Sequence, residues 1–465
     1  MQETAGFTSE ARTRPLKELA REIFLETLAE VDVARAFVRK VERRGSTLHF
    51  GGERVDLARF ERIWVVSFGK AAWATYEALC AALGERHQPQ RGVVASNVPP
   101  RAVPEGFAAF HAGHPVPTEQ SLAAAEAILE LLQEGDEKTL VFFLISGGGS
   151  ALVEKPLDFA SLGSTRDKRD KPLGKNLTLD DMQALNRVLV ECGASIDEIN
   201  AVRKHLSAIK GGRLRAAAGK AHTVTFLLSD VPEGKLATIA SGPTLPDPTT
   251  AETCYEVAAR YQLAEKFPPA IRELFEKKAL RETPKEGVEV FKRSQVFLLL
   301  SSHDVLHAAH RAAGAHGFLA ECELCCDDWE LAKAADCLFS HLEAMQRENP
   351  GQPVCLISGG EILSRVTGEG QGGRNQAFVL HCTEKIAGRE AAVLSAGTDG
   401  IDGNSPAAGA VADGQSLFRA QEKGLDAGDC FRRSDSFHFF KVLGDAILTG
   451  PQQNNLRDLR LLLAR

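Results

Sequence analysis

The sequence contains no apolar run that approaches the ~18 residues needed for a membrane-spanning helix. Its first thirty residues are polar and charged, and they lack the apolar core of a secretory signal. The ten cysteines are scattered along the chain, as reduced thiols are in proteins of the cytoplasm. We therefore predict a soluble, cytoplasmic protein without a membrane partner.

The chain also lacks an excess of charge of one sign. It has 55 Lys and Arg against 62 Asp and Glu, and a net charge of -7. This balance gives no electrostatic reason to expect a nucleic-acid partner. A length of 465 residues allows two or three domains. Because residues 277–293 are polar and broken by Pro284 and Gly287, we predict domains over residues 1–285 and 286–465.

Three common functional signatures are missing. None of the four Gly-Lys pairs is followed by Ser or Thr with a P-loop glycine upstream, which excludes a Walker-type ATPase. The aspartates of the loop 399–403 are three residues apart rather than alternating, which excludes an EF-hand. No G-x-S-x-G elbow surrounds Ser146 or Ser150, so acyl transfer fits the sequence less well.

Two groups of potential metal ligands are incomplete. Cys322, Cys325 and Cys326 crowd together, but no second CxxC pair lies within reach to complete a zinc site. We interpret these cysteines as buried thiols. His111 and His114 have the spacing of a metal pair without further clustered ligands, and we interpret them as loop histidines.

A glycine triplet follows the most apolar segment of the chain. Residues 141–150 read VFFLISGGGS, which predicts a strand buried on both faces that ends in a glycine turn. Open α/β sheets bind ligands at such strand ends, and glycines let backbone N–H groups turn toward an anion. Residues 354–364, VCLISGGEILS, repeat the pattern. We therefore predict an α/β protein with two lobes that face one cleft.

Charged residues follow two other predicted strands. Lys70 lies between a strand at residues 63–67 and a helix, where a lysine can hold a phosphate. Asp230 follows a strand at residues 222–229, where a carboxylate can hold magnesium or act as a base.

A second pair of cations borders a predicted helix. Ser195 with Glu198 forms a capping box at the start of this helix. At helical spacing, Arg203 and Lys210 border its apolar stripe, whereas Lys204 points away from it. We also predict a closing helix that contains the leucines at positions 456, 459 and 463.

One glycine pattern would suit an oxidoreductase. Gly368, Gly370 and Gly373 satisfy the dinucleotide-binding pattern G-x-G-x-x-G. The preceding residues 362–367 alternate apolar and polar side chains like an exposed hairpin strand, and Arg374 follows directly. A phosphoryl-transfer enzyme matches the whole inventory better, because such an enzyme needs glycine loops and cations for phosphates and carboxylates for magnesium.

The motifs occur in a specific order: FGKAA, AGHPVP, LISGGGSAL, N-x-VRKHLS-x-IKGGRL, SDVPEG, SGPT, GGRNQ and AGTDGIDG. In this order the chain closely resembles the glycerate 2-kinase family with its MOFRL-type C-terminal domain, from about Leu16 to the C-terminus. The resemblance implies a Rossmann-like parallel sheet in the N-terminal domain and a smaller α/β C-terminal domain. It also implies an active site in the interdomain cleft, where ATP, Mg²⁺ and D-glycerate meet.

The resemblance further implies roles for individual residues. Lys70 and Arg374 match the cations that stabilise the phosphoryl group, and Asp230 and Asp399 match strand-end aspartates with metal or base roles. The residues expected to bind substrate or phosphate are Ser146, Gly147, Gly148, Gly149, Ser150, Arg203, Lys210, Gly372 and Gly373.

We accordingly predict transfer of the γ-phosphoryl group of ATP to the 2-hydroxyl of D-glycerate, which gives 2-phosphoglycerate. An NAD(P)H-dependent hydroxypyruvate reductase is the alternative, since some family members carry that label. Whether the chain forms a homodimer is left open. The chain departs from the family's TGPT-x-TN motif at Gln452, Gln453 and Asn454, which removes hydroxyl groups there.

Overall fold

In the computed structural model, residues 10–99, 102–159, 176–229, 231, 234–452 and 454–465 are described. The chain forms two compact units: Phe37–Leu299, and Met1–Ala36 together with Leu300–Arg465. These units differ from the predicted domains, because the first 36 residues group with the C-terminal part. Helix α2 (Leu16–Glu30) packs on α12 (Ser302–Ala315), a contact partner that the periodicity of α2 does not reveal.

A six-stranded sheet forms the centre of the unit 37–299. Its strand order is β6-β5-β4-β7-β8-β9, and the neighbouring pairs from β6 to β8 are parallel. The predicted parallel sheet is therefore confirmed. The strands are β4 (Arg62–Phe68), β5 (Arg91–Ser96), β6 (Phe107–His111), β7 (Thr139–Ile145), β8 (His222–Leu228) and β9 (Ser294–Leu300).

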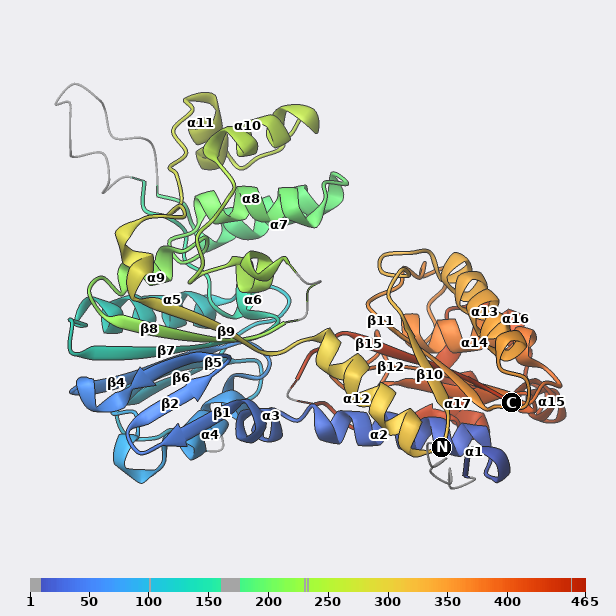
Figure 1. Cartoon of the computed structure of the whole chain (residues 1–465). Helices are drawn as coiled ribbons and strands as arrows, with labels where there is room; N and C mark the ends of the chain where they lie inside the picture. The colour runs from blue at the N-terminus through green and yellow to red at the C-terminus, as the bar shows by residue number, and fades with distance from the viewer. Residues whose placement is uncertain (1–9, 100–101, 160–175, 230, 232–233, 453) are drawn as a thin grey trace. The chain divides into compact units, whose positions relative to one another are not determined.

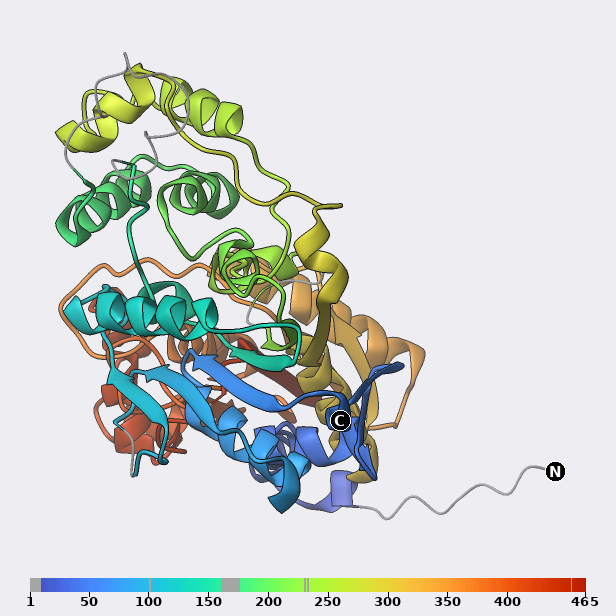
Figure 2. The same ribbon diagram turned by 90° about the vertical axis from the view of Figure 1, so that its left-hand side faces the viewer.

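Helices and a small sheet cover the two faces of this sheet. Helix α5 packs on one face, between the sheet and helices α7 and α8 (Figures 1 and 2). On the other face, Phe50 of the small antiparallel sheet β1-β2-β3 contacts Phe226 of β8. The elements of this unit besides the large sheet are α3 (Val33–Lys40), β1 (Val41–Arg44), β2 (Thr47–Phe50), β3 (Glu53–Asp56), α4 (Ala72–Leu83), α5 (Glu119–Gln133), α6 (Gly149–Leu152), α7 (Leu179–Glu191), α8 (Ile196–Leu206), α9 (Arg213–Ala217), the 3₁₀ segment η4 (Leu236–Ser241), α10 (Ala251–Arg260) and α11 (Pro269–Glu276).

The other unit contains a mixed six-stranded sheet of order β10-β11-β15-β12-β13-β14. Only β10 and β11 are parallel, and the other neighbours are antiparallel. Helices α2 and α12 pack on this sheet, as do α13 and α14, whose apolar residues form a common core with it (Figure 1). The remaining elements are α1 (Glu10–Thr13), β10 (Leu319–Glu323), α13 (Leu331–Glu348), β11 (Val354–Gly359), α14 (Arg374–Ile386), β12 (Ala391–Gly397), β13 (Gly409–Asp413), α15 (Ser416–Glu422), α16 (Ala427–Arg432), α17 (Ser436–Leu443), β14 (Ala446–Ile447) and β15 (Asp458–Ala464).

The predicted closing helix is wrong. Residues 458–464 form β15, which lies between β11 and β12 in the sheet. Every residue of β15 is buried, including the charged residues Asp458 and Arg460. Leucines at positions 456, 459 and 463 fit helical spacing equally well, and a short apolar run does not distinguish the two structures.

No helix among the described residues is both long and apolar enough to cross a bilayer.

Candidate functional site

The motifs FGKAA and LISGGGSAL meet at the carboxyl edge of the parallel sheet. Strands β4 and β7 are neighbours, and the loops that follow them are hydrogen-bonded to each other. The Lys70 N–H donates to the Gly147 carbonyl at 3.0 Å. The Ala71 N–H donates to Ser146 Oγ, also at 3.0 Å. Ser146 is buried and joins the two loops, so its hydroxyl has a structural contact in addition to its predicted place in the anion site.

The glycine triplet turns through a left-handed residue. Gly148 has a φ of +81°, a conformation that favours glycine. A Cβ atom at this position would lie 2.9 Å from His114 Cδ2 and 3.4 Å from Lys70 Cγ. The side chains of His114 and Lys70 therefore flank the turn. From the sequence we interpret His114 as a loop histidine, and its AGHPVP segment is one of the ordered motifs.

Two further polar residues support the loop. The hydroxyl oxygens of Ser150 and Ser241 are 2.8 Å apart, and Ser241 also donates to Asn200 Oδ1 at 3.4 Å. Ser241 has a φ of 61°, which is a strained conformation for a residue other than glycine. Such strain is often found at functional sites. Asn200 and Ser241 begin the motifs N-x-VRKHLS and SGPT, but the sequence assigned them no role, because they approach Ser150 only in the folded chain.

Lys210 supports the same loop from inside the protein. Its ammonium is fully buried, forms an ion pair with Glu154, and donates to the Ser150 carbonyl at 3.1 Å. Burial lowers the pKa of Lys210 to about 8, although the neighbouring Glu154 carboxylate raises it. The structure therefore places Lys210 behind the glycine loop, where it positions Ser150.

Arg203 differs from the other cations of this edge. Its side chain is half-buried, and its Nε has no hydrogen-bond partner. Within the described residues its guanidinium forms no ion pair, although the charge of Glu154 acts on it. Burial lowers the pKa of Arg203. Buried polar groups are nearly always hydrogen-bonded. The N–H donors of the Arg203 guanidinium are therefore suited to an anionic ligand.

Lys204, which is predicted to point away from the apolar stripe of its helix, is not exposed to solvent. Lys204 is buried, and its ammonium lies 3.2 Å from the carboxylate of Asp247. A helical projection cannot anticipate this contact, because Asp247 lies in a loop far along the sequence.

Arg374 is the first residue of α14 in the other unit, and two carboxylates hold it. Its Nε lies 2.6 Å from Asp458 Oδ2, and its Nη2 lies 2.9 Å from Glu361 Oε1. Burial lowers the pKa of Arg374, but the two carboxylates outweigh this effect and raise the pKa. Sequence reasoning missed Asp458, because its segment was assigned to a helix. The guanidinium is therefore fixed in one orientation at the helix start.

The loop that contains Gly372 and Gly373 is hydrogen-bonded to the loop that follows β12. Asp402 accepts hydrogen bonds from the backbone N–H groups of Asn375 at 3.1 Å and Gln376 at 2.9 Å. The Gly372 N–H donates to Asn404 Oδ1 at 2.8 Å. A Cβ atom on Gly373 would lie 2.3 Å from Asp402 Oδ1, so only glycine fits here. Asp402 therefore caps α14 and positions Arg374.

Asp399 lies close to Asp458 at the end of β12. A Cβ atom on Gly397 would lie 3.2 Å from Asp399 Oδ1 and 3.4 Å from Asp458 Oδ1. Both carboxylates therefore border Gly397. Among the described residues, no three carboxylate or imidazole groups lie close enough together to form a complete metal cage. Asp230, the other predicted aspartate, lies outside the described residues.

The glycines of the dinucleotide-like pattern do not form a strand-to-helix turn. Strand β11 ends at Gly359, and residues 360–373 separate it from α14. Gly370 donates a backbone hydrogen bond to the Arg433 carbonyl at 3.0 Å, and a Cβ atom on Gly368 would lie 2.5 Å from the same oxygen. In a Rossmann fold these glycines directly follow the strand. The pattern therefore serves local packing in this chain.

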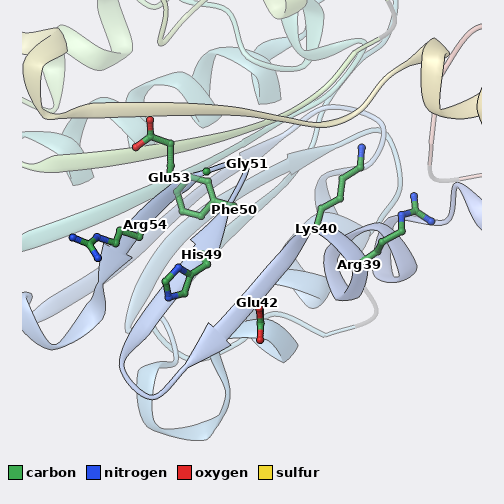
Figure 3. Close-up of a pocket in the computed structure, with 9 residues that line it drawn as sticks. Arg39, Lys40, Glu42, His49, Phe50, Gly51, Glu53 and Arg54 are labelled. Atoms are coloured by element: carbon green, nitrogen blue, oxygen red, sulfur yellow. The ribbon is translucent and has the colours of Figure 1, made fainter.

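A separate surface hollow lies on the small sheet β1-β2-β3 and the end of α3 (Figure 3). It contains none of the predicted site residues. Its charged lining is mixed in sign, and consists of Arg39, Lys40, Glu42, His49, Glu53 and Arg54.

Comparisons with known proteins agree over most of the chain. Residues 19–276 match the domain of unknown function DUF4147, and residues 354–458 match the MOFRL family. The D-glycerate 2-kinase of Thermotoga maritima is 34% identical over 411 residues, which cover 88% of this chain and 92% of that protein. A provisionally named hydroxypyruvate reductase of Agrobacterium vitis is 38% identical over 413 residues, which cover 86% of this chain and 87% of that protein. The crystal structure of a Thermotoga maritima glycerate kinase superposes with a TM-score of 0.80 at 32% identity, over 97% of this chain and 99% of that chain.

Proposed function

The chain belongs to the glycerate 2-kinase family, and we propose that it transfers the γ-phosphoryl group of ATP to the 2-hydroxyl of D-glycerate. The observation that carries this proposal is the sheet edge where Lys70 and His114 flank the left-handed turn at Gly148. This edge offers a lysine, a histidine and a glycine turn to an anion, as phosphoryl transfer requires. ATP and D-glycerate are the small-molecule partners.

Arg203 is the residue that we assign to an anionic group of the substrates. Its guanidinium is half-buried and forms no ion pair within the described part of the chain. The guanidinium fork matches the geometry of a carboxylate or phosphate. Lys210 and Ser241 act indirectly, because they fix the position of Ser150 beside this group.

Arg374 is the residue that we assign to the charge developing on the transferred phosphoryl group. Asp458 and Glu361 orient it, so little reorganisation is needed during the reaction. A fixed cation of this kind stabilises the transition state more than the ground state. Asp399 or Asp230 orients or deprotonates the accepting hydroxyl.

Asp399, with Asp230, forms the pair of residues that we assign to Mg²⁺. The Asp399 carboxylate borders Gly397, and carboxylate oxygens are the hard ligands that Mg²⁺ prefers. Mg²⁺ is usually held in kinases by one or two carboxylates plus substrate phosphates, which fits a pair of aspartates without a full cage. When bound, the ion neutralises phosphate charge. We further propose that the protein acts in the cytoplasm.

A direct assay separates the kinase from the reductase. Purified protein is given MgATP and D-glycerate while ADP release is followed, and in parallel NADH and hydroxypyruvate while NADH oxidation is followed. The kinase proposal predicts glycerate-dependent ADP release and no NADH oxidation. Hydroxypyruvate-dependent oxidation without ADP release would contradict it.

Variants connect the activity to the site. Lys70→Ala and Arg374→Ala should each lower kcat roughly 10²- to 10³-fold, the usual cost of removing one stabilising group. Lys220→Ala and Arg432→Ala remove exposed cations outside the site and should leave kcat unchanged. Near-normal turnover of either site variant would refute the assigned roles.

A further inference from the structure

Three cysteines form a cluster that the proposed reaction does not use. Cys325 and Cys326 follow β10, and Cys337 lies on α13. The interpretation of Cys322, Cys325 and Cys326 as buried thiols is wrong for the first two, which are exposed. β10 is the edge strand of its sheet, so the residues at its end are not covered by a neighbouring strand.

The sulfur atom of Cys325 contacts the other two sulfurs of the cluster. Cys325 Sγ lies 3.6 Å from Cys326 Sγ and 3.6 Å from Cys337 Sγ. All three sulfurs lie within 4.8 Å of one another. Cys326 is buried, Cys337 is half-buried and Cys325 is exposed, so the cluster opens to solvent on one side.

These separations match those of thiolates around one metal ion. Tetrahedral zinc with Zn–S bonds of ~2.3 Å places neighbouring sulfurs about 3.8 Å apart. A disulfide would require one pair to approach to ~2.05 Å and would leave the third sulfur unused. Three sulfurs within 4.8 Å of one another, two pairs of them at 3.6 Å, therefore fit a shared cation better than a bond between two of them.

The surroundings of the cluster are suited to a cation. Glu323 Oε1 accepts a hydrogen bond from the Cys325 N–H at 2.9 Å, and Glu323 Oε2 lies 3.0 Å from His341 Nδ1. His341 follows Cys337 by one turn of α13, and its Nε2 lies 3.1 Å from Glu321 Oε2. The Glu323 carboxylate thus lies beside the cluster, while the positive charge of the buried Arg460 guanidinium acts on Cys326. Burial and the neighbouring thiols raise the pKa of Cys325, so a metal would displace a proton from each thiol that it binds.

We propose that Cys325, Cys326 and Cys337 form a binding site for a thiophilic divalent cation of the Zn²⁺ class. The fourth ligand is Glu323 or a water molecule on the open side of Cys325. The site would pin the segment after β10 to α13. The next residue, Asp327, forms two hydrogen bonds to Arg457 at 2.6 and 2.5 Å. Because Arg457 precedes Asp458, the metal would also stiffen the support of Arg374.

The test uses the full chain, reduced and stripped of metal, with Cd²⁺ as the optical probe and Zn²⁺ as the competitor. One Cd²⁺ per chain should give ultraviolet thiolate-to-cadmium absorption, and one Zn²⁺ should abolish it. The double variant Cys325→Ser/Cys337→Ser should lose this absorption, whereas the control Cys192→Ser should retain it. Zn²⁺ should raise the Tm of the wild type and not that of the double variant.

Folding of the variants is checked by circular dichroism without metal. Cys325 is exposed, so Cys325→Ser alone should fold like the wild type and should weaken Cd²⁺ binding at least tenfold. Absence of Cd²⁺ absorption in the wild type would overturn the proposal. The same holds if the absorption persists in the double variant, or if Cys192→Ser also loses it. Kinase turnover is not used as a readout, so failure of the proposed function would leave this test intact.

Discussion

The orientation of Arg374 depends on individual ion pairs. The guanidinium is held by Asp458 and Glu361, which come from the start of β15 and the loop after β11. An arginine without such contacts would lose side-chain conformational entropy each time it engaged the phosphoryl group. Arg374 is already oriented before the reaction. Asp458 is therefore a positioning residue for the proposed reaction.

Replacing Asp458 tests this role. Asp458→Asn keeps the shape of the side chain but removes its charge, so Arg374 is held by Glu361 alone. We expect kcat to fall roughly 10- to 100-fold, as is typical when an outer partner of a functional group is lost. The KM for D-glycerate should change little. Asp413→Asn, which alters an ion pair with Lys17 in the same unit, is the control and should retain kcat. Equal kcat values for the two variants would contradict the positioning role.

Lys210 gives a prediction about pH. The pKa of Lys210 is lowered by burial from 10.5 to about 8 in the folded chain. Between these values the unfolded chain binds more protons, so the free energy of unfolding should rise as pH increases from 8 to 10.5. This contribution is up to about 3 kcal/mol and is lost as pH falls through 8.

Urea unfolding at several pH values measures this contribution of Lys210 to the free energy of unfolding. Lys210→Met should remove the rise between pH 8 and 10.5, and at pH 7 it should destabilise the fold because Glu154 loses its buried partner. Lys220→Met, at an exposed lysine, should keep the wild-type pH dependence. If Lys210→Met leaves the slope of the unfolding free energy against pH unchanged, the pKa of Lys210 is not lowered in the folded chain.

At the scale of elements, the loop between β7 and α6 depends on one backbone conformation. Gly148→Ala should cost about 1–2 kcal/mol because of its positive φ. Its Cβ would also press against His114 and Lys70, so kcat/KM should fall at least tenfold. Gly193 is a matched control, with a φ of +80° and nothing within 4 Å of an added Cβ. Gly193→Ala should lose similar stability and no activity. Equal activity of the two variants would exclude a role for this turn.

Elements with local signals could be predicted from the sequence. The capping box of Ser195 with Glu198 is present as expected, because both partners lie within one turn. The buried strand β7 and its glycine turn were also predicted correctly. β15 was not, because the leucines at positions 456, 459 and 463 also have helical spacing.

The site contacts that were missed join residues that are distant in sequence. Ser241 reaches Ser150, Lys204 reaches Asp247, and Asp458 reaches Arg374. No periodicity connects such pairs, and only the fold brings them together. Conversely, the glycines at positions 368 and 370 match a motif locally but pack against Arg433 in the fold. Short patterns therefore identified the loops, and the structure identified their partners.

At the scale of the whole molecule, the proposed residues are divided between the two compact units. Lys70 and Arg203 belong to the unit 37–299, whereas Arg374 and Asp399 belong to the other. Each unit has its own apolar core around its own sheet. The proposed phosphoryl transfer requires both sets of residues in one reaction, so the product of that reaction is the most direct test.

The decisive measurement identifies which hydroxyl receives the phosphoryl group. The protein is incubated with MgATP and D-glycerate, and the product is passed to enolase without phosphoglycerate mutase. We predict formation of phosphoenolpyruvate with enolase alone, because enolase accepts 2-phosphoglycerate. A signal that appears only after mutase is added would mean transfer to the 3-hydroxyl and would contradict the account. Absence of ATP consumption would contradict the kinase itself.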